Sequence, residues 1–483
     1  MSCVKKLKCL LCGKEYTSKE VKYNCPQCGG DEGILEVIND YTGIKKDFNP
    51  GILGRNKEFS IWRYLPLLPV DDPTKIGPLK VGWTPLYEAK RIREDLGMPN
   101  FWIKDDGRNP TASLKDRPSA LAVVKAQELG EEIVTCASTG NAALLSCQSI
   151  AILPEGMSKE RFQWLSQVAG EVIATPGTES NVKEIFDKTW ELKKTRDNVV
   201  VFNQFEELGN HLWHYEVTGQ AMEEVLSQVM NSKDHYAGVV LTTGSAGTLG
   251  CGDYLKELYP ESKVAAGEAL QCPTMLANGF GAHRIEGIGD KHIPWIHNVK
   301  NTDLVIAIDD RDVMSLIRLF NEPAGKAYLK EKKIPEETIE SLPLMGISSV
   351  ANLLMAVKFA RYYELTARDI ILTVFTDSME LYGSRLEELE EEYGPYTKEE
   401  AAIDFHRHLQ ALTTDYLQEL TYPDRKRIHN LKYFTWIEQQ GKDLEELKAQ
   451  WYDYENYWGS IHRQTGEIDK LIEEFNRRTG LLR

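Results

Sequence analysis

The feature that most constrains the fold is an alternation of short apolar runs with helical patterns over residues 83–385. The runs are rich in Val, Ile and Leu, as in VVVF at 199–202, GVVL at 238–241 and IILTVF at 370–375. Strands that are apolar throughout and separated by helices predict βαβ units, with mostly parallel sheets covered on both faces. At 483 residues the chain is too long for one ordinary core, so two or three domains are expected.

Composition divides the rest of the chain. Residues 1–38 hold four closely spaced cysteines, and residues 39–82 form a connector rich in Pro, Gly and aromatic side chains. Beyond 385, the acidic stretch LEELEEEYGPYTKEE leads into amphipathic patterns with many Tyr and Trp. We therefore predict that residues 386–483 form a helical C-terminal extension, whose aromatic side chains pack against the body or a second subunit.

Charge and cysteine usage exclude several classes of protein. The net charge of −16 argues against a nucleic-acid partner, and the absence of any run of eighteen apolar residues argues against a membrane span. The N-terminal sequence MSCVKKLKCLLC is unlike a signal peptide. Because the cysteines outside the first module are scattered, as in a reducing compartment, we expect a cytoplasmic protein.

The four N-terminal cysteines form two pairs. Cys9 and Cys12 belong to one CxxC knuckle, and Cys25 and Cys28 belong to a second one after twelve intervening residues. Each knuckle offers two thiolates from one turn, which suits tetrahedral zinc. Four thiolates leave no position open for water, so the predicted site is structural. A rubredoxin-like iron site would use the same ligands.

Lys115 lies in the segment NPTASLKDR at 109–117. Most lysines are solvated surface charges, but this one follows an apolar run and a proline-containing turn, and a helical pattern follows it. That placement could hold an amine at a domain cleft, where loss of solvent lowers the pKa of the amine for Schiff-base chemistry.

Two polar loops, CASTGNA at 136–142 and TGSAGT at 243–248, each follow an apolar run. The second also precedes a helical pattern. Backbone N–H groups at such a helix start bind carboxylates or phosphates, although each loop alone would equally suit an ordinary turn.

The segment NPTASLKDR resembles the NPTGSFKDR motif of threonine synthases and the SVKDR motif of cysteine synthases. Both groups are fold-type II pyridoxal-phosphate (PLP) enzymes of the tryptophan synthase β family. Further segments resemble that family in the same order over about 83–386, including 203–219, 283–294 and 344–349. The cysteine module resembles that of certain threonine synthases.

The resemblance implies an α/β fold with two three-layer αβα domains and the cofactor in the cleft between them. The core would span 83–385, with a smaller subdomain at about 110–215 inserted in the larger one. Lys115 would carry PLP as a Schiff base. The other implied cofactor contacts are Asn141, Gly244, Ser245, Ala246, Gly247, Thr248 and Ser378, and the implied substrate contacts are Ser138, Thr139, Gly140 and Gln204.

Ser378 belongs to FTDSMELY at 375–382, which resembles the PDSxERY segment of cysteine synthases. It matches the serine that faces the pyridine nitrogen. A neutral hydroxyl there favours elimination at the β or γ carbon over transamination.

The implied function is that of a PLP-dependent lyase or transferase of amino-acid metabolism, which catalyses β- or γ-elimination or replacement on an activated amino acid. One alternative is the large PLP subunit of a 2-amino-4-ketopentanoate thiolase-like enzyme, which would need a small partner subunit. Another is a PLP-binding scaffold without catalysis. A homodimer is expected by resemblance.

One stretch departs from the family pattern. Only Ala142–Gln148 separate the loop ending at Asn141 from the apolar run SIAIL. Seven helical residues span about 10 Å, whereas a parallel crossover normally needs a dozen residues or more. Either the crossover is unusually short or residues are missing from the sequence between Leu144 and Ser149.

Overall fold

The fold was analysed in a computed structural model. It describes residues 4–9, 12–17, 20–21, 24–28, 35–39, 50–53, 55–68, 70–88, 100–129, 133–137, 148–169, 171–178, 180–196 and 199–465. The steps from Leu144 to Cys147 lie outside these residues, so the question of the short crossover stays open.

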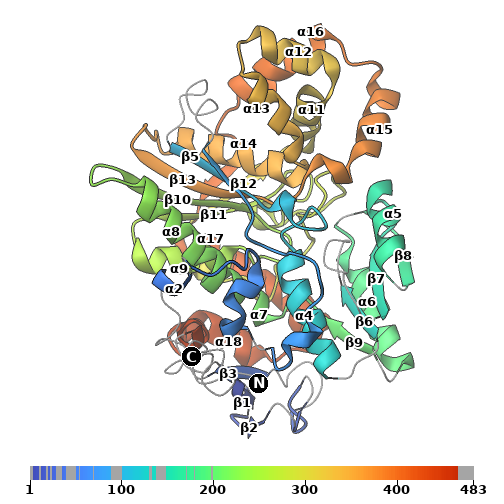
Figure 1. The fold of residues 1–483 in the computed structure, drawn as a ribbon, viewed down its shortest axis with the longest axis vertical. Helices are drawn as coiled ribbons and strands as arrows, with labels where there is room; N and C mark the ends of the chain where they lie inside the picture. The colour runs from blue at the N-terminus through green and yellow to red at the C-terminus, as the bar shows by residue number, and fades with distance from the viewer. Residues whose placement is uncertain are drawn as a thin grey trace.

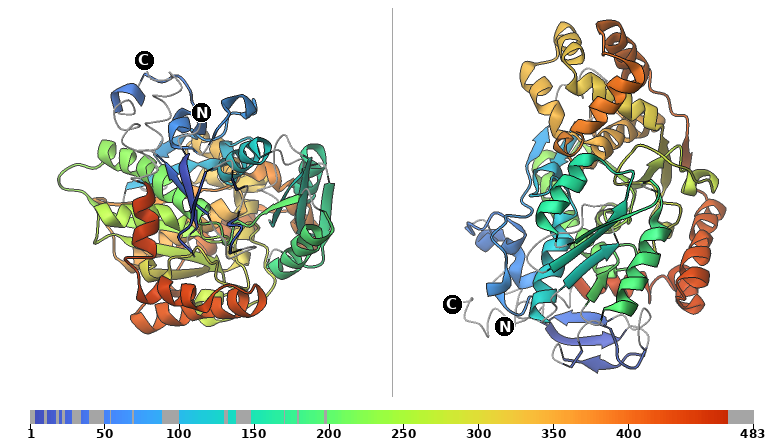
Figure 2. Two further views of the ribbon diagram at one scale, coloured as in Figure 1. Left: turned by 90° about the horizontal axis from the view of Figure 1, so that it is seen from below. Right: turned by 90° about the vertical axis from the view of Figure 1, so that its right-hand side faces the viewer.

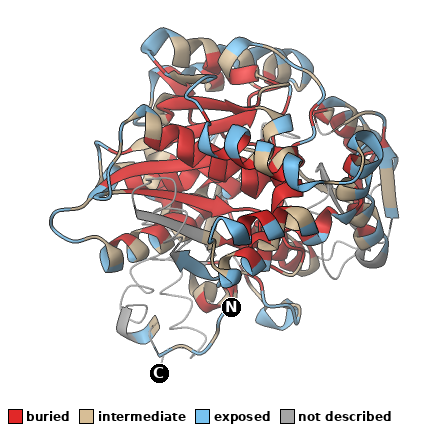
Figure 3. Cartoon of the chain, turned by 90° about the horizontal axis from the view of Figure 1, so that it is seen from above, coloured by how far each residue is buried: buried red, intermediate tan, exposed pale blue. Residues whose placement is uncertain are grey.

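A seven-stranded sheet forms the centre of the molecule (Figure 1). Its five inner strands are parallel, and one short antiparallel strand closes each edge. The strands, in spatial order, are β14 (Leu417–Glu419), β12 (Leu304–Ile308), β11 (Lys263–Ala269), β10 (His235–Thr242), β13 (Asp369–Phe375), β5 (Asn100–Asp105) and β4 (Leu86–Glu88). Strands β10, β11, β12 and β13 are buried almost throughout, as their continuous apolar sequences predicted (Figure 3).

Helices cover both faces of this sheet (Figure 1). One face is covered by α14 (Ile347–Tyr362). The other is covered by α8 (Gly219–Val229), α9 (Leu249–Leu258) and α17 (Tyr422–Lys432).

A second sheet has four parallel strands and lies beside the first (Figures 1 and 2). Its spatial order is β8 (Glu171–Thr175), β7 (Gln148–Pro154), β6 (Ile133–Ala137) and β9 (Val199–Phe202). Its helices are α4 (Asp116–Glu128), α5 (Lys159–Val168) and α6 (Val182–Thr195). The two sheets with their helices confirm the predicted α/β class.

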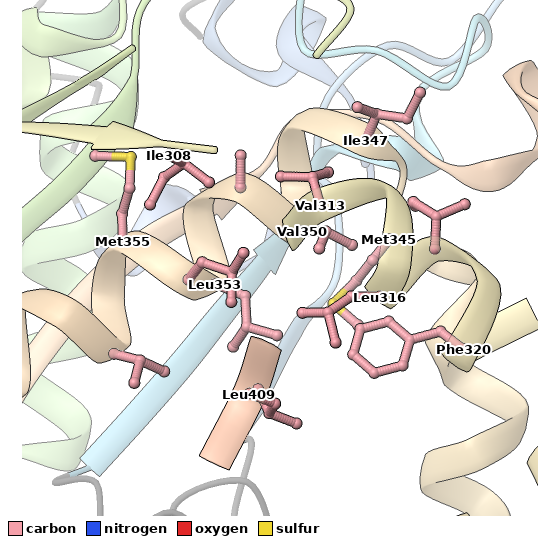
Figure 4. Packing of buried hydrophobic residues seen from close by; sticks show 14 of the residues in the cluster. Ile308, Val313, Leu316, Phe320, Met345, Ile347, Val350, Leu353, Met355 and Leu409 are labelled. Carbon is pink, nitrogen blue, oxygen red and sulfur yellow. The ribbon is translucent and has the colours of Figure 1, made fainter. Parts of the chain in front are cut away.

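The largest apolar cluster lies between α14 and α11 (Asp310–Asn321) (Figure 4). Val313, Leu316 and Phe320 of α11 pack against Val350 and Leu353 of α14. Helix α14 is buried on nearly every side, so it is apolar all round.

The helices that complete this lobe are α12 (Pro323–Glu331), α13 (Glu336–Ser341), α15 (Gly383–Tyr393) and α16 (Lys398–Asp404). Among the described residues no single helix is long and apolar enough to cross a membrane. One pair, 336–344 with 347–362, meets the length and composition together but is bent by 118°.

The C-terminal extension is helical, as predicted, and it also supplies an edge strand that the sequence did not predict. Strand β14 pairs antiparallel with β12. Helices α17 and α18 (Leu444–Tyr452) then run along the body. The side chains of Trp436, Trp451 and Trp458 are buried, and the Trp436 indole donates to the Ile293 carbonyl at 2.8 Å. These three tryptophans therefore pack inside the same chain, whereas other aromatic side chains of the extension, such as Tyr422, Phe434 and Tyr452, are exposed.

The N-terminal module is a three-stranded antiparallel sheet in the order β2 (Glu15–Tyr16), β1 (Val4–Cys9) and β3 (Leu35–Asn39). It lies at the end of the molecule opposite the α11–α16 lobe (Figure 1).

Candidate active site

A cavity opens where the strands β9, β10 and β13 end and α4 begins. In parallel α/β sheets, ligands bind at the carboxyl ends of the strands. The cavity is lined by Ser113, Leu114, Lys115, Pro118, Gln204, Asn210, His214, Thr242, Gly244, Ser245, Ala246, Gly247, Thr248, Gly287, Ile288, Ser348, Thr376 and Asp377. It therefore brings together Lys115, the whole segment 244–248 and Gln204, which lie far apart in the sequence.

Lys115 is the residue immediately before the first turn of α4. Its loop is fixed to the end of β13, because the Leu114 N–H donates to the Thr376 carbonyl at 3.0 Å and Ser113 forms a β-bridge with Asp377. Ala112 takes a left-handed conformation with φ of 53°, which turns the chain sharply before the lysine. The ammonium is thus held at the cavity by a loop with little freedom.

Asp116 and Arg117, the last two residues of NPTASLKDR, form contacts that hold the loop in place. The Asp116 carboxylate accepts the Thr111 N–H at 2.7 Å and also bonds the Thr111 hydroxyl, which closes the loop around the lysine. Arg117 and Asp106 form a buried ion pair. Burial raises the pKa of Asp116 to about 7, while its hydrogen bonds to Thr111 act in the opposite direction.

The glycine-rich turn joins β10 to α9 and presents the N-terminus of that helix to the cavity. Ala246 has a positive φ of 64°, and a Cβ on Gly247 would lie 2.2 Å from the Asn210 Oδ1 atom. The Asn210 amide donates to the Ser245 hydroxyl at 3.1 Å and to the Gln204 carbonyl at 3.0 Å. Backbone N–H groups and the helix dipole favour an anion at such a turn.

Ser348 and Thr376 supply the hydroxyl groups that line the cavity from α14 and from the end of β13. Their oxygens are 2.5 Å apart, and both side chains are buried. Asp377 is fixed beside them, because its carboxylate accepts the Ser349 hydroxyl at 2.9 Å and the Tyr382 hydroxyl at 2.6 Å.

Ser378 is not among the residues that line this cavity, although Asp377 beside it is, and its predicted contact with the cofactor stays a prediction. Its hydroxyl accepts the Glu380 N–H at 3.3 Å and caps the short helix η7 (Met379–Leu381). Ser348 and Thr376 present hydroxyl groups at the cavity wall near it. Ser348 belongs to the segment 344–349, whose similarity to cysteine synthases is the sequence signal for it.

Asp290 is a second residue that the sequence did not single out. Its carboxylate is buried, and the described residues provide no hydrogen-bond partner for Oδ2. That oxygen lies 3.8 Å from the position of a Cβ on Gly244, so Asp290 stands directly behind the cavity wall. Burial raises the pKa of Asp290 to about 7, and the charge of Lys115 acts in the opposite direction.

His214 also lines the cavity and is buried. Its Nδ1 atom lies 2.9 Å from the Thr218 hydroxyl, and burial lowers its pKa to about 3. The imidazole is therefore neutral at ordinary pH. The predicted contacts Ser138, Thr139, Gly140 and Asn141 lie outside the described residues.

The four cysteines of the N-terminal module come together in space. The Sγ atoms of Cys9 and Cys28 are 3.7 Å apart, as are those of Cys12 and Cys25, and all four lie within 4.8 Å of one another. A tetrahedron with zinc–sulfur bonds of about 2.3 Å has edges of about 3.8 Å. The cluster therefore has the dimensions of a four-thiolate metal site.

Most residues that line the cavity, including Lys115 and the turn 244–248, fall in the range matched by a known family model. The family model described as "Pyridoxal-phosphate dependent enzyme" matches residues 78–326, about half of the chain. The threonine synthase of Methanocaldococcus jannaschii is 44% identical over 157 residues, which cover 31% of this chain and 38% of that enzyme. A probable cysteine synthase of Bacillus subtilis is 27% identical over 317 residues, covering 63% of this chain and 94% of that protein.

Solved structures give the same result for the fold. A hydrogen sulfide-producing enzyme of Fusobacterium nucleatum superposes with a TM-score of 0.51 at 25% identity, covering 64% of this chain and 98% of that one. The O-acetylserine dependent cystathionine β-synthase of Helicobacter pylori superposes with a TM-score of 0.50 at 24% identity, covering 64% of this chain and 96% of that one.

Proposed function

The chain belongs to the family of pyridoxal-phosphate dependent enzymes, and from that premise we propose that it catalyses β- or γ-elimination or replacement on an activated amino acid. The observation that supports this most directly is the single cavity wall formed by Lys115, the turn 244–248 and the Ser348–Thr376 pair. O-acylated or O-phosphorylated serine or homoserine is the substrate class that suits it. When bound, PLP withdraws electrons from the substrate's α carbon.

The residues present fit this cofactor. Lys115 would hold its aldehyde carbon covalently, and the turn 244–248 would hold its phosphate through backbone N–H groups at the start of α9. The bare backbone at Gly247 supports this assignment, since any side chain there would collide with Asn210. Ser348 and Thr376 would face the ring nitrogen together with the predicted contact Ser378.

Each of these groups has a separate task in the proposed reaction. The substrate amine would displace the Lys115 amine from the cofactor. The freed Lys115 amine would then take the proton from the substrate α carbon. Neutral hydroxyl groups from Ser348 and Thr376, rather than a carboxylate, would leave the ring less electron-withdrawing and favour loss of a β or γ leaving group. Substrate contacts from residues 138–141 and from Gln204 remain part of the proposal.

Release of the leaving group tests the proposal. We expect the holoenzyme to liberate acetate or phosphate from at least one O-acetylated or O-phosphorylated serine or homoserine, and to do so faster when a thiol is added. Acetate and phosphate are measured by coupled assays, with serine and homoserine themselves as controls. Turnover of none of the four activated amino acids would contradict the proposed reaction class.

Because Asp290 lies behind the cavity wall, it would accept a proton from the incoming thiol or water through one bridging water molecule. Its folded-state pKa of about 7 lies above the ordinary value of 3.8, because burial disfavours the charged form. A base must be ionised, so the replacement rate should rise as the pH increases through about 7 and then level off. The same shift means that protonated Asp290 stabilises the fold below about pH 4, a contribution lost as the pH rises through 7.

Asp290→Asn is therefore expected to remove the rising limb of the pH–rate profile and to lower the replacement rate by about 10²-fold. Steady-state rates between pH 5 and 9 measure this, with cofactor absorbance as the control for an intact site. A variant that keeps the rising limb near pH 7 would show that another group is responsible.

The proposal also covers the metal of the cysteine module, the cellular compartment and the oligomeric state. We assign structural zinc to Cys9, Cys12, Cys25 and Cys28, because their spacing suits a four-thiolate tetrahedron. We assign the chain to the cytoplasm as a homodimer. None of the six cysteines whose side chains are described forms a disulfide, which supports a reducing compartment.

A further inference from the structure

Three buried side chains from distant parts of the sequence meet behind the cavity. His211 belongs to α7 (Leu208–Trp213), Asp253 to α9, and His462 to the C-terminal extension. The Nε2 atoms of the two histidines are 2.9 Å apart. One oxygen of Asp253, Oδ2, lies 3.6 Å from the His211 nitrogen and 3.5 Å from the His462 nitrogen. Two imidazoles and a carboxylate thus share one point in the interior.

The dimensions of this triangle suit a small divalent cation. A point equidistant from the three atoms lies about 1.9 Å from each of them. Zinc binds histidine nitrogen at about 2.0–2.1 Å and carboxylate oxygen at about 2.0–2.2 Å, so an ion slightly above the plane satisfies all three ligands. The two rings are nearly parallel, at 13° to each other, with their Nε2 atoms on the same side of the cluster as Asp253.

The charge balance around Asp253 also favours a cation. The carboxylate is buried and is held by two neutral amides, with Asn298 donating to Oδ2 and Asn301 to Oδ1, both at 2.7 Å. The ammonium of Lys256, one turn along α9, is paired with Asp303 at 2.5 Å. A buried carboxylate facing neutral imidazoles is costly without a positive charge. A metal ion would supply that charge, and the two amides would orient the ligand oxygen.

We propose that His211, Asp253 and His462 bind a divalent transition-metal ion, with zinc as the preferred ion and water in the fourth position. The site is separate from the four-cysteine cluster and from the cofactor cavity, which none of its three ligands lines. Two imidazoles and one carboxylate are borderline ligands that suit zinc better than magnesium or calcium.

The position of the site gives the ion a structural task. Helix α7 carries Asn210, which lines the cavity, and α9 begins at the glycine-rich turn. His462 brings the C-terminal extension onto both helices, where its ring also stacks on Tyr215 with centroids 4.3 Å apart. The ion would therefore tie the extension to the two helices that shape the cofactor site.

Zinc binding to the full-length chain tests this proposal. In the background Cys12→Ser/Cys28→Ser, which disables the four-cysteine cluster, equilibrium dialysis against zinc chloride should leave one zinc per chain, measured by plasma mass spectrometry. Adding His462→Gln or Asp253→Asn should weaken that binding by about 100-fold or more. His429→Gln is the matched control, because His429 is a buried histidine of the same extension that bonds only to the Leu447 carbonyl in the described part of the chain.

The result that would overturn the proposal is a Cys12→Ser/Cys28→Ser chain that retains no zinc, or one whose zinc is unaffected by His462→Gln. A second measurement uses the unaltered chain, so that it does not depend on whether the variants fold. Crystals of the unaltered chain soaked in zinc chloride should give an anomalous peak at the zinc edge between His211, Asp253 and His462. A map with a peak at the four cysteines and none here would mean that the two histidines share only a hydrogen bond.

Discussion

Lys115→Ala is expected to lower turnover by at least about 10³-fold, the largest effect of any single substitution in the chain. The reason is that one amine has two tasks in the proposed reaction, covalent attachment of the cofactor and transfer of the α proton. Among the described residues, no nearby side chain is placed to replace it. Lys104, a half-buried lysine on β5, donates to the Thr84 hydroxyl at 2.6 Å and to the Thr84 carbonyl at 3.0 Å.

A chemical readout separates the loss of attachment from the loss of activity. Borohydride reduction of the holoenzyme followed by peptide mass mapping should find the cofactor on the peptide that contains Lys115, and on no peptide of Lys115→Ala. Lys125→Ala is the control, since Lys125 lies on α4 as well but pairs with Asp71 and Glu128 away from the cavity. Cofactor found on another lysine, together with normal turnover, would refute the assignment.

The sheet architecture was predictable because it depends on patterns contained in short stretches of sequence. Strands β10, β12 and β13 are almost continuous apolar runs that alternate with helices along the chain, so the parallel arrangement follows from local information. Lys115 and the turn 244–248 were each predicted from one short motif through its resemblance to a known family. The edge strand β14 was missed because three residues, LQE at 417–419, have no pattern of their own and pair only after β12 is in place.

Features that depend on packing between distant segments were not predictable from local sequence. Ser378 and Ser348 are both serines near the end of an apolar run or the start of a helix, and only the folded chain shows which of them lines the cavity. Asp290 has no sequence signal beyond its place after two glycines. The meeting of His211 with His462 joins positions 251 residues apart, and it exists only because the extension folds back onto α7 and α9.

Gly247→Val is expected to weaken cofactor binding by at least about 100-fold, which corresponds to about 2.7 kcal/mol. A Cβ at this position would lie 2.2 Å from Oδ1, 2.6 Å from Cγ and 2.7 Å from Nδ2 of Asn210. The Asn210 carboxamide cannot yield easily, because it is buried and donates to Ser245 and Gln204. The branched side chain would force either the turn or α7 to move, and the backbone N–H groups would no longer converge on the phosphate.

Titration of the apo-chain with PLP, followed by the change in cofactor absorbance, measures this effect without any substrate. Gly209→Val is the matched control, because Gly209 is next to Asn210 on α7 and a Cβ there meets no atom of the described residues within 4 Å. The two variants add the same side chain at neighbouring places, so a difference between them isolates the collision at the turn. Equal affinities for PLP in Gly247→Val and Gly209→Val would mean that the phosphate is bound elsewhere, since the proposed role of residues 244–248 requires the bare backbone at Gly247.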